Sequence, residues 1–327
     1  MNPVDMATTI TQKQKLHNRE KEQHLYNFII NPAARSGLGR KTWKKVEKIL
    51  LKQKIEYRVF YTRGQKDAGR IARKVTSGPD PVKLVLIGGD GTLHEMVSGI
   101  ENWENVSVGY IPVGSGNDFA RGMGWKRSAK RQLENILRPD ENWQVDCGRA
   151  QTELGGGRFM VSAGIGYDAG VCWLVNHSRL KKILNRLRLG KMTYLILGVY
   201  QLFASKRFRG ELELDGRCKV FLRDILFCSV HNLPYEGGGV PFCPKADPMD
   251  GKMDVCVVSR VPKRKLPVLL LQALKGQHIK YRGVRVYRCK EIKIHARTPQ
   301  YFHMDGEVIG KVRKVKIRTE KGKVHML

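Results

Sequence analysis

The sequence predicts an α/β domain with an open, mostly parallel sheet, followed by a β-rich, antiparallel, sandwich-like domain. Between residues 24 and 145, apolar runs alternate with stretches in which apolar residues recur every three or four positions, the pattern of strands followed by helices. Residues 146–327 contain mostly strand-like runs instead. A chain of 327 residues is also long enough for two domains.

A polar, basic tail, residues 1–23, precedes both domains. We expect it to be solvated or to form a frayed helix. It lacks the apolar core that a signal peptide needs.

The first domain should contain strands and helices in alternation. We expect the strands near residues 25–31, 56–62, 82–88 and 106–112, and the helices near residues 40–53, 65–76, 92–101 and 128–138. Ligands of such sheets bind at the carboxyl ends of the strands, so the small and polar residues that follow strands are the first candidates for a site.

The first strand should end at Pro32, which cannot donate a hydrogen bond to a neighbouring strand. Asn31, Ser36 and Gly37 lie around the loop that follows. Its small residues would let a phosphate approach the backbone, and Arg35 could neutralise that phosphate. By itself the segment also fits an ordinary loop between a strand and a helix.

The third strand and its turn are the most informative segment. Leu84–Ile87 read as a buried strand, and Gly88, Gly89, Asp90 and Gly91 follow at the start of a helix. Free backbone N–H groups and the helix dipole favour a phosphate there. Asp90 would repel it unless a cation such as Mg²⁺ lies between them. The alternative is a tight turn in which Asp90 caps the helix.

The fourth strand, Gly109–Val113, also runs into small residues. Ser115, Asn117 and Asp118 follow it near the expected start of another helix, where such side chains commonly cap. The carboxyl ends of parallel strands share one edge of a sheet, which brings the three segments together.

The second domain should be mainly antiparallel, and its last strand could return to the first domain. Strand-like runs cover residues 159–161, 211–214, 220–230, 253–258, 291–295 and 312–317. Residues 168–206 look helical instead. Their basic and apolar part, residues 179–188, could lie on an anionic bilayer or pack on the sheet with a solvated basic face.

Asp305, Gly306 and Glu307 stand between two strand-like runs. Asp-Gly is a strong turn dipeptide, so a hairpin is the simplest interpretation. The two carboxylates are also the candidates for a catalytic base if the chemistry requires one.

The composition limits the kinds of partner that we expect for this protein. The formal charge is +30, from 60 Lys and Arg against 30 Asp and Glu, and indicates a polyanionic partner such as a membrane surface or nucleotide phosphates. The basic residues follow no nucleic-acid-binding pattern, so we expect no nucleic acid. The seven cysteines form no Cys-x-x-Cys pair, which fits a reducing compartment and does not suggest a metal cluster. The apolar stretch at residues 194–204 is too short to span a bilayer.

Together these segments resemble the lipid kinases of the diacylglycerol kinase catalytic-domain family, above all its soluble bacterial and YegS-like members. Sphingosine and ceramide kinases are more distant. Ser115 stands where relatives often carry threonine and keeps the hydroxyl. The matching residues occur in the family's order: Asn31-Pro32, Ser36-Gly37, Thr62, Asp67-Ala68, Gly88–Thr92 with Glu95, Gly114–Arg121, Gly237–Gly239, Pro244–Ala246, Asp250-Gly251, Met253–Val255 and Asp305–Glu307.

The resemblance implies an ATP- and Mg²⁺-dependent kinase in which residues 24–145 form the α/β nucleotide-binding domain and residues 146–327 the lipid-substrate domain. Asp90 and Asp118 would organise Mg²⁺. Glu307 would be the catalytic base with Asp305 in the metal–water network, and these two roles could be exchanged. The implied ATP-binding residues are Asn31, Pro32, Ser36, Gly37, Thr62, Gly88, Gly89, Asp90, Gly91, Thr92, Glu95, Ser115 and Asn117.

A second, structural Mg²⁺ site is implied at the segment that ends at Lys252. Asp250 would give its carboxylate, and Asp247 and Lys252 their backbone carbonyls. A type I turn closed by Asp250 and Gly251 fits the same residues.

The acceptor that the resemblance implies first is diacylglycerol, and ceramide, sphingoid bases and monoacylglycerol stay open. Such an enzyme would be cytoplasmic and bind peripherally to the anionic inner face of the membrane. A homodimer is compatible with the sequence. The alternatives are a soluble-substrate kinase of the NAD kinase type and a non-enzymatic basic binding protein. Four carboxylates on a basic chain argue against the second alternative: Asp90, Asp118, Asp305 and Glu307.

Overall fold

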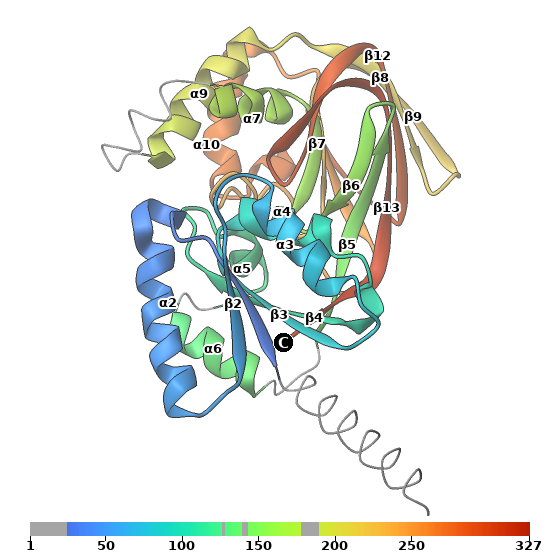
Figure 1. Cartoon of the computed structure of the whole chain (residues 1–327). Coiled ribbons are helices and arrows are strands. Elements are labelled where there is room, and N and C mark those ends of the chain that lie inside the picture. Colours follow the sequence, from blue (N-terminus) through green and yellow to red (C-terminus); the bar gives the residue numbers. More distant parts are fainter. Residues whose placement is uncertain (1–24, 126–127, 139–142, 178–189) are drawn as a thin grey trace, which may run out of the picture.

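The computed structural model describes residues 25–125, 128–138, 143–177 and 190–327 (Figure 1). The basic tail, residues 1–23, and the basic, apolar segment, residues 179–188, lie outside the described residues, and so does the expectation attached to each. Within the described residues, no helix is long and apolar enough to cross a membrane.

The N-terminal part contains four parallel strands in the order β2-β1-β3-β4. They are β1 (Tyr26–Ile30), β2 (Tyr57–Tyr61), β3 (Val82–Gly88) and β4 (Val106–Pro112). The helices between and after them are α2 (Ala34–Lys52), α3 (Asp67–Thr76), α4 (Asp90–Gly99), α5 (Asp118–Gly122) and α6 (Ala129–Leu137). Each predicted strand and helix of this part is present within a few residues, α5 begins at Asp118 where a helix start was expected, and α2 begins earlier than expected.

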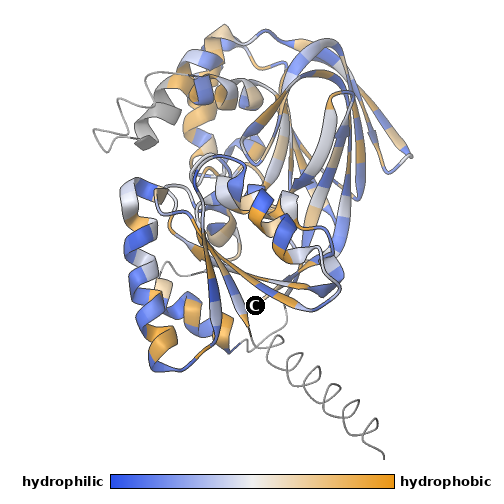
Figure 2. Ribbon diagram, in the orientation of Figure 1, coloured by the Kyte–Doolittle hydropathy of each residue, from blue (hydrophilic) through white to orange (hydrophobic). Residues whose placement is uncertain are grey.

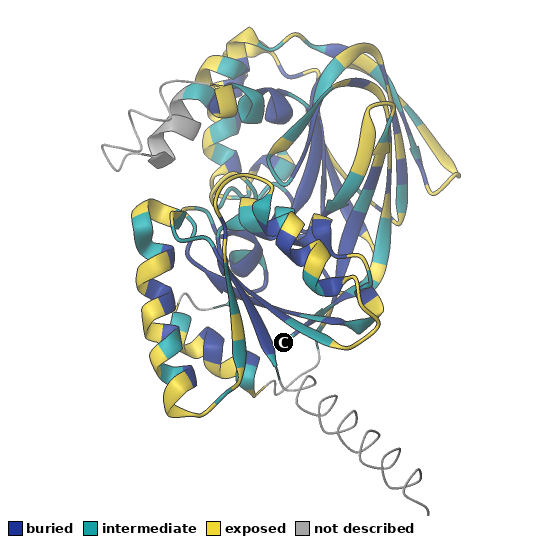
Figure 3. Cartoon of the chain, viewed as in Figure 1, coloured by how far each residue is buried: buried dark blue, intermediate teal, exposed yellow. Residues whose placement is uncertain are grey.

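Helices cover both faces of these strands because successive side chains of a strand point to opposite sides. Phe28 and Ile30 of β1 pack with Trp43 of α2, whereas Ile29 packs with Ile71 of α3. The whole of β1 is buried, while α2 keeps one side exposed (Figure 3). The apolar colouring concentrates along the strands in the same way (Figure 2).

The early start of α2 reflects a distorted first turn. Arg35, Ser36 and Gly37 have positive φ angles of 45°, 55° and 91°, so regular helix begins only after them. Three consecutive left-handed residues form a turn at the carboxyl end of β1, and backbone turns of this kind can bind anions.

The C-terminal part is built from antiparallel strands that curl around a second core (Figure 1). Helices α7 (Tyr167–His177), α9 (Gly190–Ala204) and α10 (Leu266–Ala273) lie beside it. The strands are β5 (Trp143–Thr152), β6 (Gly155–Phe159), β7 (Ser162–Gly166), β8 (Phe208–Leu214), β9 (Cys218–His231), β10 (Met253–Ser259), β11 (Val284–Cys289), β12 (Glu291–Met304) and β13 (Glu307–Met326).

One prediction for this part needs correction. The strand expected at residues 159–161 is present only at Phe159, which ends β6, and Met160 and Val161 link β6 to β7 because their amides bond to Asp305 instead of a neighbouring strand. The helical character expected for residues 168–206 is confirmed in the described residues, which form α7 and α9.

Strand β13 joins the two parts. It pairs with β12 and β5, and its end reaches β4, where His325 and Met326 pair in parallel with Ser107 and Val108. The described strands therefore form one continuous sheet, and the last strand of the chain occupies the edge of the parallel strands.

Candidate active site

The residues that follow β1, β3 and β4 meet at one edge of the sheet. The Asn31 side chain donates to Thr92 Oγ1 at 3.0 Å, which links the first loop to α4. Gly89 and Gly114 lie so close that a Cβ on Gly114 would stand 2.7 Å from the Gly89 Cα. Position 114 therefore requires glycine, and the predicted juxtaposition of these loops is observed.

Asp90 does not cap its own helix. Its two carboxylate oxygens accept the amides of Asp118 and Phe119 at 3.1 and 3.3 Å, so it anchors the start of α5. Oδ2 of Asp118 in turn accepts the Gly238 amide at 2.7 Å. A Cβ on Gly116 would lie 3.2 Å from Oδ2 of Asp90 and 3.4 Å from Oδ2 of Asp118, so the two carboxylates face one point.

This pair of carboxylates is buried and lacks a full counter-charge. Burial raises the pKa of Asp90. Burial and then the charge of Asp90 raise the pKa of Asp118 to about 7, although Arg121 attracts it from 3.8 Å. Oδ1 of Asp118 is buried without a hydrogen-bond partner. A site of this kind favours either a proton or a cation, and its oxygen donors suit Mg²⁺.

Asp305 is fully engaged with neighbouring groups. It accepts the amides of Met160, Val161 and Ser162 at 2.9, 2.8 and 3.1 Å, and it faces Nδ1 of His94 at 3.1 Å. Its side chain is 3% exposed. These contacts connect the hairpin between β12 and β13 to α4. Asp305 therefore suits the role of a structural anchor better than that of a proton acceptor.

Glu307 is the exposed carboxylate of the same hairpin. It follows the turn formed by Asp305 and Gly306, and it pairs through the backbone with Met304. Burial opposes ionisation of His94, but Asp305, with smaller contributions from Glu307 and Glu95, raises the pKa of His94. Glu307 therefore acts electrostatically on the cluster around Asp305 while it stays open to solvent.

The remaining predicted nucleotide-binding residues lie around this edge. Thr62 follows β2 and donates its amide to Ile30 at 2.9 Å. Ser115 is exposed, whereas Asn117 is buried in a left-handed conformation with an unpartnered Oδ1. Pro32, Ser36, Gly37 and Gly91 are at least partly accessible.

The segment proposed as a second Mg²⁺ site forms a turn. Asp247 and Asp250 accept the amides of Met249 and Lys252 at 3.0 and 2.8 Å. Oδ2 of Asp250 also lies 3.4 Å from the Arg288 guanidinium, which competes with a metal for that oxygen. These contacts fit the turn interpretation, and the structural Mg²⁺ site stays a prediction.

The sequence did not predict a role for two further residues of this region, His94 and Gly238. His94 follows Asp90 by four positions, and helical spacing alone could have placed it beneath the same site. Gly238 could not have been assigned as a donor to Asp118, because 120 residues separate the two in the chain.

Two domain families match most of the chain. Residues 26–150 match the diacylglycerol kinase catalytic domain, and residues 160–324 match the YegS C-terminal NAD kinase beta sandwich-like domain. The chain is 31% identical to the "Putative lipid kinase YtlR" of Bacillus subtilis over 86% of its own length and 93% of that protein. It is 28% identical to the diacylglycerol kinase of Bacillus subtilis over 69% of this chain and 71% of the relative.

The fold is also found among solved structures. A "putative diacylglycerol kinase" from Bacillus anthracis superposes with a TM-score of 0.71 at 21% identity, over 94% of this chain and 95% of the other. This likeness concerns the fold. Because two domains match and a relative is 31% identical over most of both chains, this chain belongs to the diacylglycerol kinase catalytic-domain family.

Proposed function

We propose that the protein is an ATP-dependent lipid kinase that transfers the γ-phosphate to the hydroxyl of a lipid alcohol, with diacylglycerol as acceptor and phosphatidic acid as product. The observation that supports this best is the pair of buried carboxylates, Asp90 and Asp118, which face one point at the carboxyl ends of the parallel strands. A base is also needed to accept the proton of the alcohol, and Glu307 lies in the hairpin that Asp305 anchors to the same region.

The loops at this edge would hold the triphosphate of ATP. Candidates are the left-handed turn at residues 35–37, the start of α4 after Gly89, and the polar groups of Thr62, Ser115 and Asn117. A helix start and consecutive left-handed residues both present backbone N–H groups to anions. The unpartnered Oδ1 of Asp118 fits the role of a Mg²⁺ ligand together with Asp90. Mg²⁺ would neutralise charge on the phosphates when bound.

Glu307 is the better candidate for the base. In the reaction the acceptor oxygen forms a bond to the γ-phosphorus, the bond from that phosphorus to the ADP oxygen breaks, and the hydroxyl proton passes to the base. Asp305 already accepts three amides and faces His94, so a proton transfer there would disrupt its hydrogen bonds. Glu307 is exposed, so its carboxylate is open to solvent and to an incoming alcohol.

A surface with exposed apolar and basic side chains supports binding to a lipid bilayer. Val268, Leu271 and Leu274, on and just after α10, are 48%, 63% and 48% exposed. The end of α9 lies beside them, since Nζ of Lys263 donates to the Phe203 carbonyl at 3.1 Å. We call this surface the α9–α10 face; its exposed members are Val199, Tyr200, Phe203, Lys263, Arg264, Lys265, Val268, Leu271, Leu274 and Lys275. Apolar side chains ringed by cations suit an anionic membrane surface.

The test is an assay of γ-phosphate transfer from ATP over a panel of acceptors in mixed vesicles. The panel contains diacylglycerol, monoacylglycerol, ceramide, a sphingoid base and NAD. We expect phosphatidic acid as the main product, in a reaction that requires Mg²⁺. Transfer to NAD with none to any lipid would overturn the proposal in favour of a soluble-substrate kinase.

A further inference from the structure

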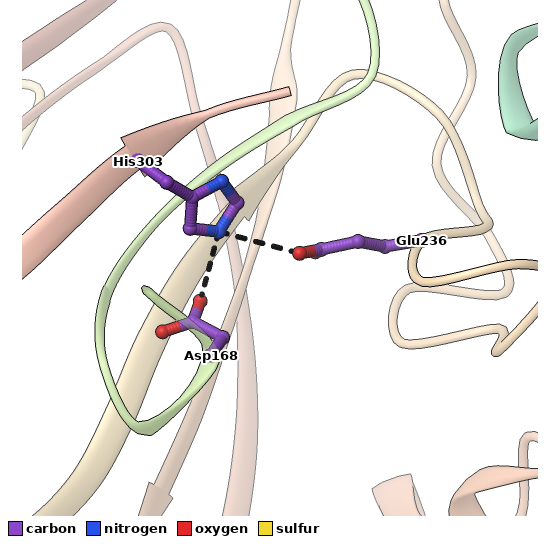
Figure 4. A group of neighbouring side chains, drawn as sticks. All are labelled: Asp168, Glu236 and His303. Atoms are coloured by element: carbon purple, nitrogen blue, oxygen red, sulfur yellow. Dashed lines mark ion pairs between the residues drawn. The ribbon is translucent and has the colours of Figure 1, made fainter. Parts of the chain in front are cut away.

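A second group of ligating side chains lies beside the candidate active site. It consists of Asp168 at the start of α7, Glu236 in the loop after β9, and His303 near the end of β12. The three side chains converge, and both carboxylates approach the same ring nitrogen of His303, Nε2 (Figure 4). One ligand atom from each lies within 4.8 Å of the other two. We call these residues the Asp–Glu–His cluster.

The spacing of the donor atoms fits a bound metal ion. Nε2 of His303 lies 3.5 Å from Oδ2 of Asp168 and 3.3 Å from Oε1 of Glu236. Donors that surround an ion tetrahedrally at about 2.0–2.2 Å are separated from each other by roughly 3.3–3.6 Å. An ion at the centre of the cluster would therefore reach the imidazole and both carboxylates with little movement.

The donor atoms are buried and poorly satisfied. The side chains of His303, Asp168 and Glu236 are 0%, 6% and 14% exposed. Nε2 of His303, Oδ2 of Asp168 and Oε2 of Glu236 have no well-directed hydrogen bond, so the contacts to His303 are ion-pair distances only. Buried polar atoms without a partner are costly, and an ion would satisfy them.

A glycine in β7 makes room for the Asp168 carboxylate beside His303. Gly164 of β7 borders the cluster, and a Cβ at this position would overlap Oδ2 of Asp168 and stand 2.8 Å from Nε2 of His303. Any other residue at position 164 would push these two donors away. Glycine is therefore required here for the cluster to keep its geometry.

The charge of the cluster also calls for a cation. Two carboxylates face one imidazole, and the described residues place no Lys or Arg in contact with either carboxylate. The fully buried imidazole of His231 lies 3.5 Å from Oε2 of Glu236. A divalent ion would balance the buried negative charge.

We propose that the Asp–Glu–His cluster is a binding site for a divalent transition-metal ion, Zn²⁺ in the first place. An imidazole with two carboxylates is a ligand set that Zn²⁺ accepts, whereas Mg²⁺ and Ca²⁺ prefer oxygen donors alone. Cys172 follows Asp168 by one helical turn on the same side of α7, and its thiol could complete the set in favour of Zn²⁺. This site is separate from the proposed Mg²⁺ ligands and does not depend on which molecule accepts the phosphate.

Occupancy of the site would act on the hairpin that carries Glu307. In the structure the Gly306 amide donates to Nδ1 of His303 at 3.1 Å, so the ring proton belongs on Nε2. An ion at Nε2 displaces that proton to solvent, and Nδ1 takes up a proton in its place. The Gly306 amide then loses its acceptor, which changes the turn between Asp305 and Glu307.

The test is metal binding to the full-length protein, measured by titration with ZnCl₂ and by the visible spectrum after loading with Co²⁺, both in excess Mg²⁺. We expect one ion per chain, a dissociation constant in the micromolar range or tighter, and the intense visible bands of Co²⁺ in a tetrahedral site. His303→Gln, Asp168→Asn and Glu236→Gln should lose the bands. Asp90→Asn, in the proposed Mg²⁺ site, and His177→Gln, an exposed histidine at the end of α7, should keep them.

The wild-type protein alone can overturn the proposal, even if a variant fails to fold. X-ray absorption of the Zn²⁺-loaded protein should show one imidazole with oxygen neighbours in the first shell. Absence of saturable binding contradicts the site, and so does a ligand set of several imidazoles or of sulfur alone. Folded cluster variants that retain the Co²⁺ bands would contradict it equally.

Discussion

At the scale of single residues, the hairpin between β12 and β13 divides two tasks between two carboxylates. Asp305 is held by three amides and His94, whereas Glu307 is exposed. The sequence could mark both as acidic residues in a turn, but it could not tell them apart. The amides that Asp305 accepts lie 143–145 residues away in the chain and His94 lies 211 residues away, so only the folded structure reveals that this side chain is an anchor.

This division predicts opposite effects for two conservative substitutions. Glu307→Gln should slow phosphoryl transfer roughly a hundredfold or more, with little change in ATP affinity or unfolding temperature, because only the proton acceptor is lost. Asp305→Asn should lower the free energy of unfolding by about 1–3 kcal/mol, because an amide nitrogen would face the amides that the carboxylate now accepts. Single-turnover rates and thermal unfolding separate the two. Equal loss of stability in both variants would contradict the assignment.

Asp118 predicts a pH dependence of stability. Its pKa is raised to about 7 in the folded protein, above its value in the unfolded chain, chiefly by burial and next by Asp90. The folded state thus retains a proton that the unfolded state has released, and stability falls as the pH rises from about 4 towards 7. Above this range the ionised carboxylate destabilises the metal-free protein.

We therefore expect Asp118→Asn to be more stable than the wild type at pH 8 in EDTA, by on the order of 1–3 kcal/mol, and to lose this advantage near pH 4.5. Mg²⁺ should stabilise the wild type more at pH 8 than at pH 6. Thermal unfolding of both proteins across this pH range provides the measurement. A wild type that exceeds the variant in stability at pH 8 without metal would refute the raised pKa.

At the scale of elements, the sequence predicted the parallel strands and their helices well, because each is a long apolar run or a clear helical period. It predicted less well where the pattern is short or broken. Strand β7 has the sequence Ser-Ala-Gly-Ile-Gly, which carries no strand preference, and its pairing with β9 and β12 supplies the stability. Helix α10 was missed because its apolar residues occur all round the helix.

The α9–α10 face predicts where the protein meets a bilayer. Leu271→Glu on α10 should weaken binding to anionic vesicles several-fold, because it places a negative, polar group in the apolar part of this surface. Leu51→Glu on α2 is a matched control, since both leucines are 63% exposed. Vesicle sedimentation compares the variants. The proposed docking surface is wrong if both substitutions reduce binding equally or if neither does.

At the scale of the whole molecule, the +30 charge should govern membrane association. Binding to vesicles that contain anionic lipid should exceed binding to neutral ones, and the difference should fade as salt shortens the Debye length from about 10 Å at 0.1 M to about 3 Å at 1 M. Sedimentation across this salt range measures it. Equal binding to neutral and anionic vesicles would mean that the basic charge serves another partner.

The whole-molecule arrangement explains why a site can form from residues 90 to 307. Strand β13 begins at Glu307 and ends against β4, so one strand ties the hairpin to the parallel strands that lead to Asp90 and Asp118 at the starts of α4 and α5. The sequence suggested that the last strand could return to the first domain, but it could not give the register. A 20-residue strand with frequent Lys and Arg resembles a solvated segment until its partners β5 and β12 are known.

The most direct test of the proposed chemistry is the rate of γ-phosphate transfer from ATP to diacylglycerol in anionic vesicles, for the wild type and Asp90→Asn as Mg²⁺ is varied. We expect the wild-type rate to rise with Mg²⁺ to saturation. The variant should lose at least about a hundredfold at every Mg²⁺ concentration. Its fold should survive, because the asparagine keeps the size of the side chain and one acceptor for the amides of α5. A wild-type-like rate in this folded variant at ordinary Mg²⁺ would contradict the proposed site.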